Sequence, residues 1–353
     1  MTRTDQLRSR FDAHGVDAFV TQSTYNRRYL TGFTGTAGAA LIAADKAQLI
    51  TDFRYTVQAR SQAEGFEIVE HKKPLLEELA EQVKAQGIQK LGFEKDHVSY
   101  TQYEALRDQL DCELVPVSGI VEDMRLVKTA EEISVIEKAV QIADEAFAHI
   151  QTYIKPGVKE IDVSNELEFF MRKQGAVSSS FDIIVASGER SAFPHGVASD
   201  KVIEPGELVT LDFGAYYNGY CSDITRTVAV GNISDELKEI YDTVLQAQIR
   251  GVNGLKPGLT GREADALTRD YIKDKGYGEY FGHSTGHGMG MEVHEGPGLS
   301  HRSDKKLEPG MVVTVEPGIY VEGTGGTRIE DDVVITEEGC RILSKSSKEL
   351  IVL

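Results

Sequence analysis

The 353-residue chain is poor in the features that mark membrane, secreted and metal-thiolate proteins. No apolar run reaches the roughly 20 residues that a helix needs to cross a bilayer, and the polar start shows no secretory signal. The three cysteines, Cys112, Cys221 and Cys340, are an odd number without the spacing of a thiolate metal site. We therefore expect a reduced, cytoplasmic protein.

Positive charge is also scarce, because 38 Lys and Arg face 56 Asp and Glu, which leaves a formal net charge of -18. A surface that binds phosphate groups needs the opposite sign, so nucleic acid and membrane are not expected as partners. The 41% hydrophobic and 27% charged residues are typical of a folded globular protein. The length predicts two domains.

Residues 1–122 alternate helical and strand patterns and predict a mixed α/β domain without a catalytic constellation of its own. The expected strands are 18–20, 38–42, 48–50, 91–93 and 112–117. The expected helices are one around Leu7, Phe11 and His14, and those over 75–83 and 103–110. Between them, residues 25–33 (YNRRYLTGF) are rich in aromatic and basic groups, and we interpret them as a packed loop.

Residues 127–353 contain an internal repeat. Residues 204–212 read EPGELVTLD and residues 308–316 read EPGMVVTVE. Each copy is a Pro-Gly turn followed by an apolar, β-branched strand that ends in a carboxylate. Upstream, a Lys-Pro-Gly turn at 155–157 and another at 256–258 each begin a helix that ends at a glycine. Two matched halves predict a pseudo-twofold domain, and two copies are too few for a solenoid.

Four acids occupy matched places in these halves. Turn residues between Asp212 and Asp223 predict a hairpin that brings both side chains together, and the same holds for Glu316 and Glu330. Four like charges in one apolar core are severely destabilising without cations. The alternative, salt-bridged surface acids, does not suit strands this apolar.

We keep that alternative, salt-bridged acids at the surface, for the neighbouring pair Asp331 and Asp332.

Residues 282–295 hold His283, His287 and His294, three of the nine histidines, among several glycines. An isolated histidine is more often a packed or surface residue than a ligand, but this clustering favours a ligand, and glycine lets the backbone pass close to a bound group. One histidine with four carboxylates suits Mn²⁺, Co²⁺ or Zn²⁺. The excess of negative charge argues for two ions, ~3.5–4 Å apart in hydrolytic metal pairs.

These motifs, in this order and followed by Arg328-Ile329-Glu330-Asp331, resemble the metallopeptidases of the pita-bread fold. That group contains prolidase (Xaa-Pro dipeptidase), aminopeptidase P and methionine aminopeptidase. Residues 127–353 resemble the catalytic domain. Residues 1–122, which include Tyr29-Leu30-Thr31-Gly32-Phe33, resemble the creatinase-like N-terminal domain of the proline-directed members. The resemblance implies an α/β (α+β) chain whose mixed N-terminal domain precedes a pseudo-twofold catalytic domain.

The resemblance also implies the site. The metal ligands are Asp212, Asp223, His287, Glu316 and Glu330. Two of them, Asp223 and Glu330, bridge two divalent ions, by preference Mn²⁺. The implied catalytic residues are His294, which steadies the oxyanion, Glu316, which shuttles a proton, and His283. The implied substrate-binding residues are His195, His283 and Arg328, the last of which orients a bridging acid or the carboxylate end of the substrate.

The implied reaction is hydrolysis, by a hydroxide that bridges the two ions, of the bond between an N-terminal residue and proline in short peptides. This bond is a tertiary amide without an N–H. The resemblance further implies a homodimer. The main alternative is an aminopeptidase P that accepts longer Xaa-Pro-Xaa peptides.

Three other interpretations stay open. A methionine aminopeptidase cleaves Met-Ala peptides and generally lacks the N-terminal domain. A creatinase-like hydrolase has the two-domain fold without the metal ligands, and a non-enzymatic binding protein should have lost the ligand acids. Metal content separates the last two from a peptidase, and a peptide panel separates the first.

Overall fold

The computed structural model describes residues 1–353, which form two compact units, Met1–Arg125 and Leu126–Leu353. Each unit combines helices with β-sheet, so the predicted α/β (α+β) class is confirmed. None of the helices has the length and apolar character that crossing a bilayer requires.

The first unit is built on one six-stranded sheet in the order β4-β3-β2-β1-β5-β6. Strand β2 runs antiparallel to β1 and β3, and the remaining neighbours are parallel. The strands are β1 Ala18–Thr21, β2 Ala39–Ala43, β3 Ala47–Thr51, β4 Glu67–Glu70, β5 Lys90–Glu94 and β6 Glu113–Val117. The helices are α1 Arg3–Arg8, α2 Phe11–His14, α3 Thr24–Thr31, α4 Thr56–Gln62, α5 Leu75–Ala85, α6 Tyr100–Gln109 and α7 Glu122–Arg125.

The strands expected in the first unit and the helices over 75–83 and 103–110 are confirmed, apart from small differences at their ends. The single helix expected around Leu7, Phe11 and His14 is divided into α1 and α2, and the prediction of a packed loop at 25–33 is wrong. Most of that segment forms helix α3. Ser23 accepts a hydrogen bond from the backbone N–H of Asn26 at its start, and Gly32 ends it in the left-handed conformation at φ +74°. Arg27 is buried because its guanidinium donates to two backbone carbonyls downstream, at 2.7 and 2.8 Å.

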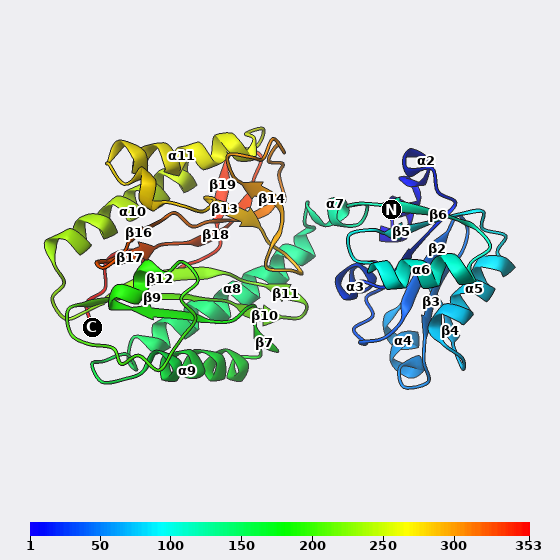
Figure 1. The fold of residues 1–353 in the computed structure, drawn as a ribbon, viewed down its shortest axis with the longest axis horizontal. Helices are drawn as coiled ribbons and strands as arrows, with labels where there is room; N and C mark the ends of the chain where they lie inside the picture. The colour runs from blue at the N-terminus through cyan, green and yellow to red at the C-terminus, as the bar shows by residue number, and fades with distance from the viewer. The chain divides into compact units, whose positions relative to one another are not determined.

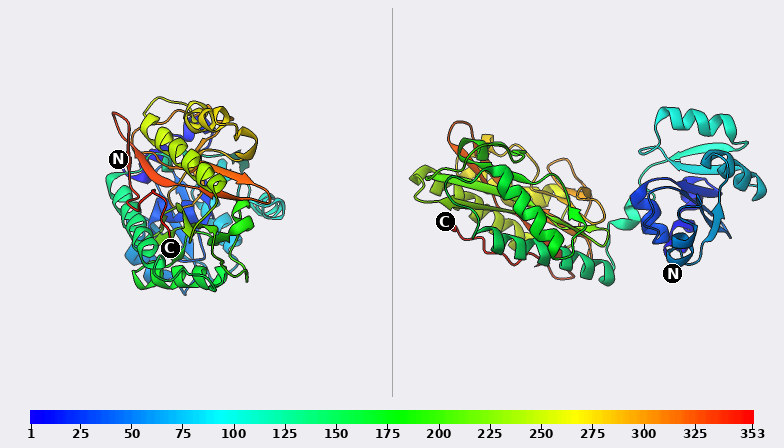
Figure 2. Two further views of the ribbon diagram at one scale, coloured as in Figure 1. Left: turned by 90° about the vertical axis from the view of Figure 1, so that its left-hand side faces the viewer. Right: turned by 90° about the horizontal axis from the view of Figure 1, so that it is seen from below.

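The second unit places its strands between two pairs of helices. In Figure 1, α10 (Asp235–Gly254) and α11 (Gly261–Asp274) lie above the strands and α9 (Glu160–Lys173) lies below them, and α8 (Ala130–Ile150) packs with α9. Seen from below in Figure 2, right, the green helices of the first half lie in front of the strands. Apolar faces of α8 and α9 pack on β8, β9 and β12 in one core.

The strands of the second unit form four small sheets with the orders β11-β10-β7, β12-β9-β8, β14-β13-β15-β18-β19 and β16-β17. In the first half they are β7 Ser178–Ser179, β8 Ile184–Ser187, β9 Glu207–Phe213, β10 Ala215–Tyr217, β11 Tyr220–Cys221 and β12 Ile224–Val230. In the second half they are β13 Gly286–Gly288, β14 Glu295–Leu299, β15 Val312–Val315, β16 Gly318–Val321, β17 Gly325–Arg328, β18 Asp331–Ile335 and β19 Cys340–Ile342. Two short 3₁₀ helices, η1 Gly188–Ala192 and η2 Gly278–Tyr280, complete the unit.

Matching backbone hydrogen bonds confirm the internal repeat. The N–H of Gly157 donates to the carbonyl of Ile203 at 2.9 Å, and that of Gly258 donates to Leu307 at 2.8 Å. Each Lys-Pro-Gly turn is thus bonded to the chain just before the Glu-Pro-Gly turn of its own half. Helices α9 and α11 follow these turns as predicted, and the antiparallel pairs β9–β12 and β15–β18 are the corresponding hairpins.

Candidate metal centre

One cavity of about 500 Å³ in the second unit is lined by carboxylates, histidines and an arginine. Every site residue predicted from the sequence lines it: Asp212, Asp223, His287, Glu316, Glu330, His195, His283, His294 and Arg328. Apolar side chains, among them Phe181, Ile184 and Val293, form part of the remaining wall. The cavity therefore combines charged side chains with a partly apolar wall, which suits a small organic ligand.

The strand ends of both halves supply the acids. Asp212 lies in β9, Asp223 directly before β12, Glu316 directly after β15 and Glu330 directly before β18. The fifth residue, His287, is the middle residue of β13. Antiparallel pairing within each half brings these ends together, and the repeat brings the two halves to the same cavity.

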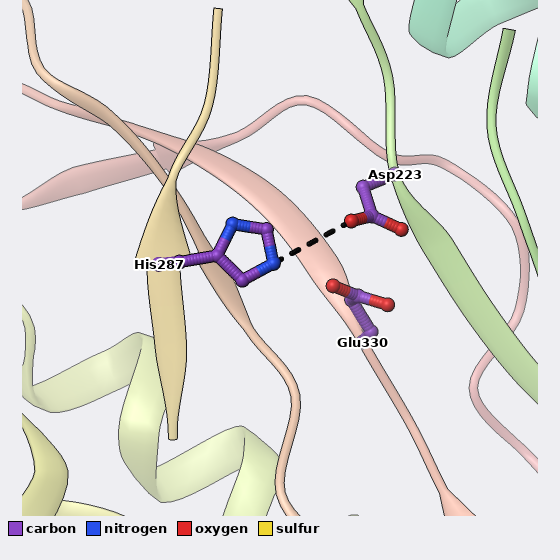
Figure 3. A group of neighbouring side chains, drawn as sticks. All are labelled: Asp223, His287 and Glu330. Atoms are coloured by element: carbon purple, nitrogen blue, oxygen red, sulfur yellow. Dashed lines mark ion pairs between the residues drawn. The ribbon is translucent and has the colours of Figure 1, made fainter. Parts of the chain in front are cut away.

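Three of these side chains form a tight group. Figure 3 shows Asp223, His287 and Glu330 pointing toward one another from different segments. One ligand atom from each lies within 4.8 Å of the other two. The Nε2 atom of His287 is 3.6 Å from Asp223 Oδ2 and 3.3 Å from Glu316 Oε1. Asp212 lies outside this group, where Arg328 pairs with its Oδ2.

The carboxylates are buried without enough hydrogen-bond donors. Asp212 Oδ1, Asp223 Oδ1 and Glu330 Oε1 have no partner, although the protein covers them. Burial, reinforced by the neighbouring carboxylates, raises the pKa of Asp223 and Glu330 well above the ordinary value. Burial also raises the pKa of Glu316 to about 8, while Arg328 opposes the shift. Unpartnered buried carboxylates are costly unless a cation binds them, so the residues fit divalent metal.

The two hairpins differ in register at the second acid. Asp212 pairs with Thr225, whereas Val315 pairs with Asp331, which sets Glu316 opposite Glu330. The counterpart of Glu330 in the first half is therefore Thr225, and Asp223 stands two residues before it. Thr225 Oγ1 donates to Glu330 Oε2 at 2.7 Å, so the two counterparts bond across the halves.

A hydrogen-bonded chain runs along one side of the cavity. Arg328 donates to Tyr320 at 2.7 Å, and the Tyr320 hydroxyl lies 2.8 Å from His283 Nε2. The other ring nitrogen, Nδ1, lies 2.8 Å from the Ser284 carbonyl and donates to it. Burial lowers the pKa of His283 to about 4 and raises that of Tyr320 to about 12. At neutral pH the ring is thus neutral, and its Nε2 accepts a hydrogen bond from the Tyr320 hydroxyl.

Sequence reasoning missed Tyr320. Its importance depends on the return strand β17, which pairs with β16 and sets Arg328 beside the phenol. No local sequence motif predicts the contact between Arg328 and Tyr320. The same structure shows that the carboxylate held by Arg328 is Asp212, which is not one of the two acids expected to bridge the ions.

His195 and His294 lie exposed at the edge of the cavity. The ring of His294 meets that of His287 edge to face, with centroids 4.4 Å apart. His195 belongs to the segment between β8 and β9, and its neighbour Pro194 accepts a hydrogen bond from Arg328 at 3.1 Å. The structure therefore brings all the predicted histidines to one cavity.

The expectation of surface acids at Asp331 and Asp332 is wrong, because both are buried. Asp331 is ion-paired as expected, with Arg226 and Lys348, each at 2.7 Å. Asp332 accepts the backbone N–H of Asp223 at 2.9 Å. Strand β18 lies between β15 and β19, and all of its residues are buried, so both of its faces are covered.

A two-domain α/β chain with a repeat-built cavity of carboxylates and histidines has the features of a metallopeptidase. Residues 134–337 match metallopeptidase family M24, and residues 3–127 match the creatinase/prolidase N-terminal domain. The chain belongs to this peptidase family.

Close relatives span the whole chain. A protein of Bacillus subtilis described as an uncharacterized peptidase is 63% identical over 350 residues, 99% of each chain. The solved structure of an Xaa-Pro dipeptidase from Bacillus anthracis is 65% identical, with a TM-score of 0.98 and 99% of each chain covered. An X-Pro aminopeptidase structure from Thermotoga maritima is 43% identical, with a TM-score of 0.91, covering 96% of this chain and 98% of the other.

Proposed function

We propose that the protein is an Xaa-Pro dipeptidase that hydrolyses the bond between an N-terminal residue and proline. In this proposal residues 127–353 are the catalytic domain and residues 1–122 the N-terminal domain. The observation that carries it is the set of buried carboxylates with unpartnered oxygens facing a histidine in one cavity. Similarity to the dipeptidase of Bacillus anthracis supports the choice of substrate.

The residues that would hold two divalent ions are Asp212, Asp223, His287, Glu316 and Glu330. Oxygen donors with a single imidazole suit Mn²⁺, and Co²⁺ or Zn²⁺ also accept this set. When bound, such a pair of ions supplies a water-derived nucleophile at neutral pH and polarises the scissile carbonyl.

The protein's own side chains then handle protons and orientation. Glu316, whose Oε1 lies 3.3 Å from His287 Nε2 in the cavity, would take up a proton and pass it to the departing proline nitrogen. His294 at the cavity edge is placed to donate a hydrogen bond to the carbonyl oxygen as negative charge develops. His195 and Arg328 orient the peptide. Because both ring nitrogens of His283 are engaged in hydrogen bonds, we assign it to shaping the substrate pocket.

Replacement of Asp223 by Ala tests the proposal. It removes one member of the tight group in Figure 3, so bound metal and turnover of an Xaa-Pro dipeptide should be lost together. Metal is measured by mass spectrometry on the purified protein, and turnover by release of proline. The exposed Asp304→Ala variant is the matched control and should keep both. Peptidase activity that survives in Asp223→Ala refutes the assignment.

An aminopeptidase P activity is the second candidate, supported by the similarity to the Thermotoga maritima X-Pro aminopeptidase. The two activities differ in whether chain beyond proline is accepted. A dipeptidase cleaves Ala-Pro and leaves Ala-Pro-Ala intact, whereas an aminopeptidase P cleaves the longer peptide. A Met-Ala peptide in the same panel tests the methionine aminopeptidase interpretation. The retained acids weigh against a metal-free hydrolase and a binding protein.

The proposal also includes a homodimer in the cytoplasm. The three cysteines are free, which is typical of a reducing compartment. Sedimentation of the purified chain tests the dimer, and cell fractionation tests the compartment.

A further inference from the structure

The segment that carries His195 combines an exposed tip with a buried base. It runs from the end of β8 at Ser187 through η1 to Ser199. At its tip, His195 and Val197 line the cavity while remaining largely open to solvent. We call residues 187–199 the His195 loop. An exposed loop places a side chain accurately only if something else holds it.

One buried carboxylate holds both ends of the His195 loop. Glu160, the first residue of α9, is 0% exposed. Its Oε1 accepts the backbone N–H and the hydroxyl of Ser187, at 2.8 and 2.9 Å. Its Oε2 accepts the backbone N–H and the hydroxyl of Ser199, at 3.2 and 2.6 Å, and also pairs with Arg190. Hydrogen bonds to a carboxylate are stronger than neutral ones, so Glu160 clamps the loop at three points.

The clamp reaches the two residues that directly follow His195. Arg190 uses its second terminal nitrogen to donate to the Val197 carbonyl at 2.9 Å. Gly196 packs so closely on Ala186 that an added Cβ would lie 2.9 Å from that side chain. Because both contacts lie within two residues of His195, a shift of Arg190 or of the loop ends moves the imidazole at the cavity edge.

The other half of the domain does without such a carboxylate. The counterpart of Glu160 is Gly261, since the two backbone N–H groups donate to Lys201 and Lys305 in the same way, both at 3.0 Å. At Gly261 an added Cβ would lie 2.1 Å from the Gly298 carbonyl oxygen, so backbone fills the space that the Glu160 side chain takes. The repeated architecture therefore does not need a buried acid here. The acid is present only in the half that carries His195.

We propose that Glu160 is a positioning residue that sets the place of His195 in the substrate pocket by clamping the two ends of the His195 loop. The inference rests on the proposed function of the cavity, in which His195 contacts the peptide. A small displacement of a group that binds substrate weakens its contact with the peptide, so the clamp should be visible in the kinetics as well as in loop dynamics.

The first experiment replaces Glu160 by Gln in the full-length, metal-loaded protein. The amide has the same shape, but its NH₂ group faces donors and cannot accept from them. Amide hydrogen exchange in residues 187–199 should speed up, bound metal should stay unchanged, and KM for Ala-Pro should rise about tenfold with a smaller change in kcat. Glu168→Gln is the matched control, because Glu168 lies on the same helix and accepts the Ser179 N–H at 2.9 Å, away from the loop.

The second experiment asks whether Glu160 acts through His195. In a His195→Ala background, Glu160→Gln should lower kcat/KM by less than about twofold, against about tenfold in the native background. Equal losses in both backgrounds, or unchanged exchange in residues 187–199, would overturn the inference. If Glu160→Gln does not fold, Ser199→Ala removes a single donor to Glu160 and takes its place in the same double-mutant cycle. It should lower kcat/KM in the native background by a smaller factor, and again by less in the His195→Ala background.

The two proposals fail separately. If the native protein does not cleave Ala-Pro at all, the proposed function is wrong. The exchange comparison between Glu160→Gln and Glu168→Gln still decides whether the clamp exists. If the native protein is active and the cycle is additive, only the positioning role is wrong.

Discussion

Removing divalent ions should make the stability of the protein fall as the pH rises from about 6.5 to 8. Burial raises the pKa of Glu316 from its ordinary 4.5 to about 8. Because the folded-state pKa is the higher one, the contribution of Glu316 is fully present below 4.5 and is lost as the pH rises through 8. Asp223 and Glu330 are shifted in the same direction.

The histidines change the stability with pH in the opposite direction, and they do so at lower pH. Burial lowers the pKa of His283 from 6.5 to about 4, so its contribution is fully present above 6.5 and is lost only as the pH falls toward 4. The window between 6.5 and 8 therefore isolates the carboxyl groups. A difference of one bound proton between the folded and unfolded states changes the free energy of unfolding by ~1.4 kcal/mol per pH unit. Glu316 alone then accounts for about 2 kcal/mol across the window, a large part of a typical 5–15 kcal/mol.

The assay is urea unfolding, followed by circular dichroism, of chelator-treated and Mn²⁺-loaded protein at several pH values. The unfolding midpoint of the chelated sample should fall between pH 6.5 and 8. The loaded sample should not show this fall, because cations favour the ionised carboxylates. Glu316→Gln should reduce the slope of the chelated sample, and exposed Glu337→Gln should leave it unchanged. A chelated midpoint that stays level or rises across the window would refute the reasoning.

Two further substitutions test the surroundings of the cavity. Arg226→Met leaves the buried carboxylate of Asp331 short of a partner and should lower the free energy of unfolding by ~3–5 kcal/mol in urea; a loss below about 1 kcal/mol contradicts this. Gly288→Ala puts a Cβ 1.9 Å from a backbone carbonyl oxygen and should displace the adjacent His287, which lowers metal affinity in calorimetry by about tenfold or more. Gly298→Ala, whose Cβ meets nothing within 4 Å, should bind metal normally.

The second unit was largely predictable because its signals are local. A Pro-Gly turn, a run of β-branched residues and a terminal acid are all read within nine residues, and their recurrence indicates the repeat. Because burying four carboxylates together is costly, the sequence alone then predicts that cations bind there. Helix α3 was missed although its local signals, Ser23 at the start and Gly32 at the end, are present. The burial of Arg27 could not be predicted, because it depends on carbonyl groups supplied later in the chain.

Side chains that act through distant partners were not predictable. Tyr320 follows no motif, and it matters because β17 returns beside it. Asp331 and Asp332 look like solvated acids because nothing in the sequence shows that both faces of β18 are covered. In the sequence, Glu160 looks like an ordinary acidic residue in the first turn of a helix. Only the fold brings Ser187 and Ser199 to its carboxylate.

The amino-acid sequence by itself therefore determined the two halves, the acids at their strand ends and the need for positive charge among them, because turn preference, strand periodicity and desolvation are properties of short segments. Only the tertiary structure decided which carboxylates share a cation-sized space, which one Arg328 holds, and how the loop of His195 is clamped. These contacts join residues far apart in the chain, and their energies depend on burial that exists only after folding.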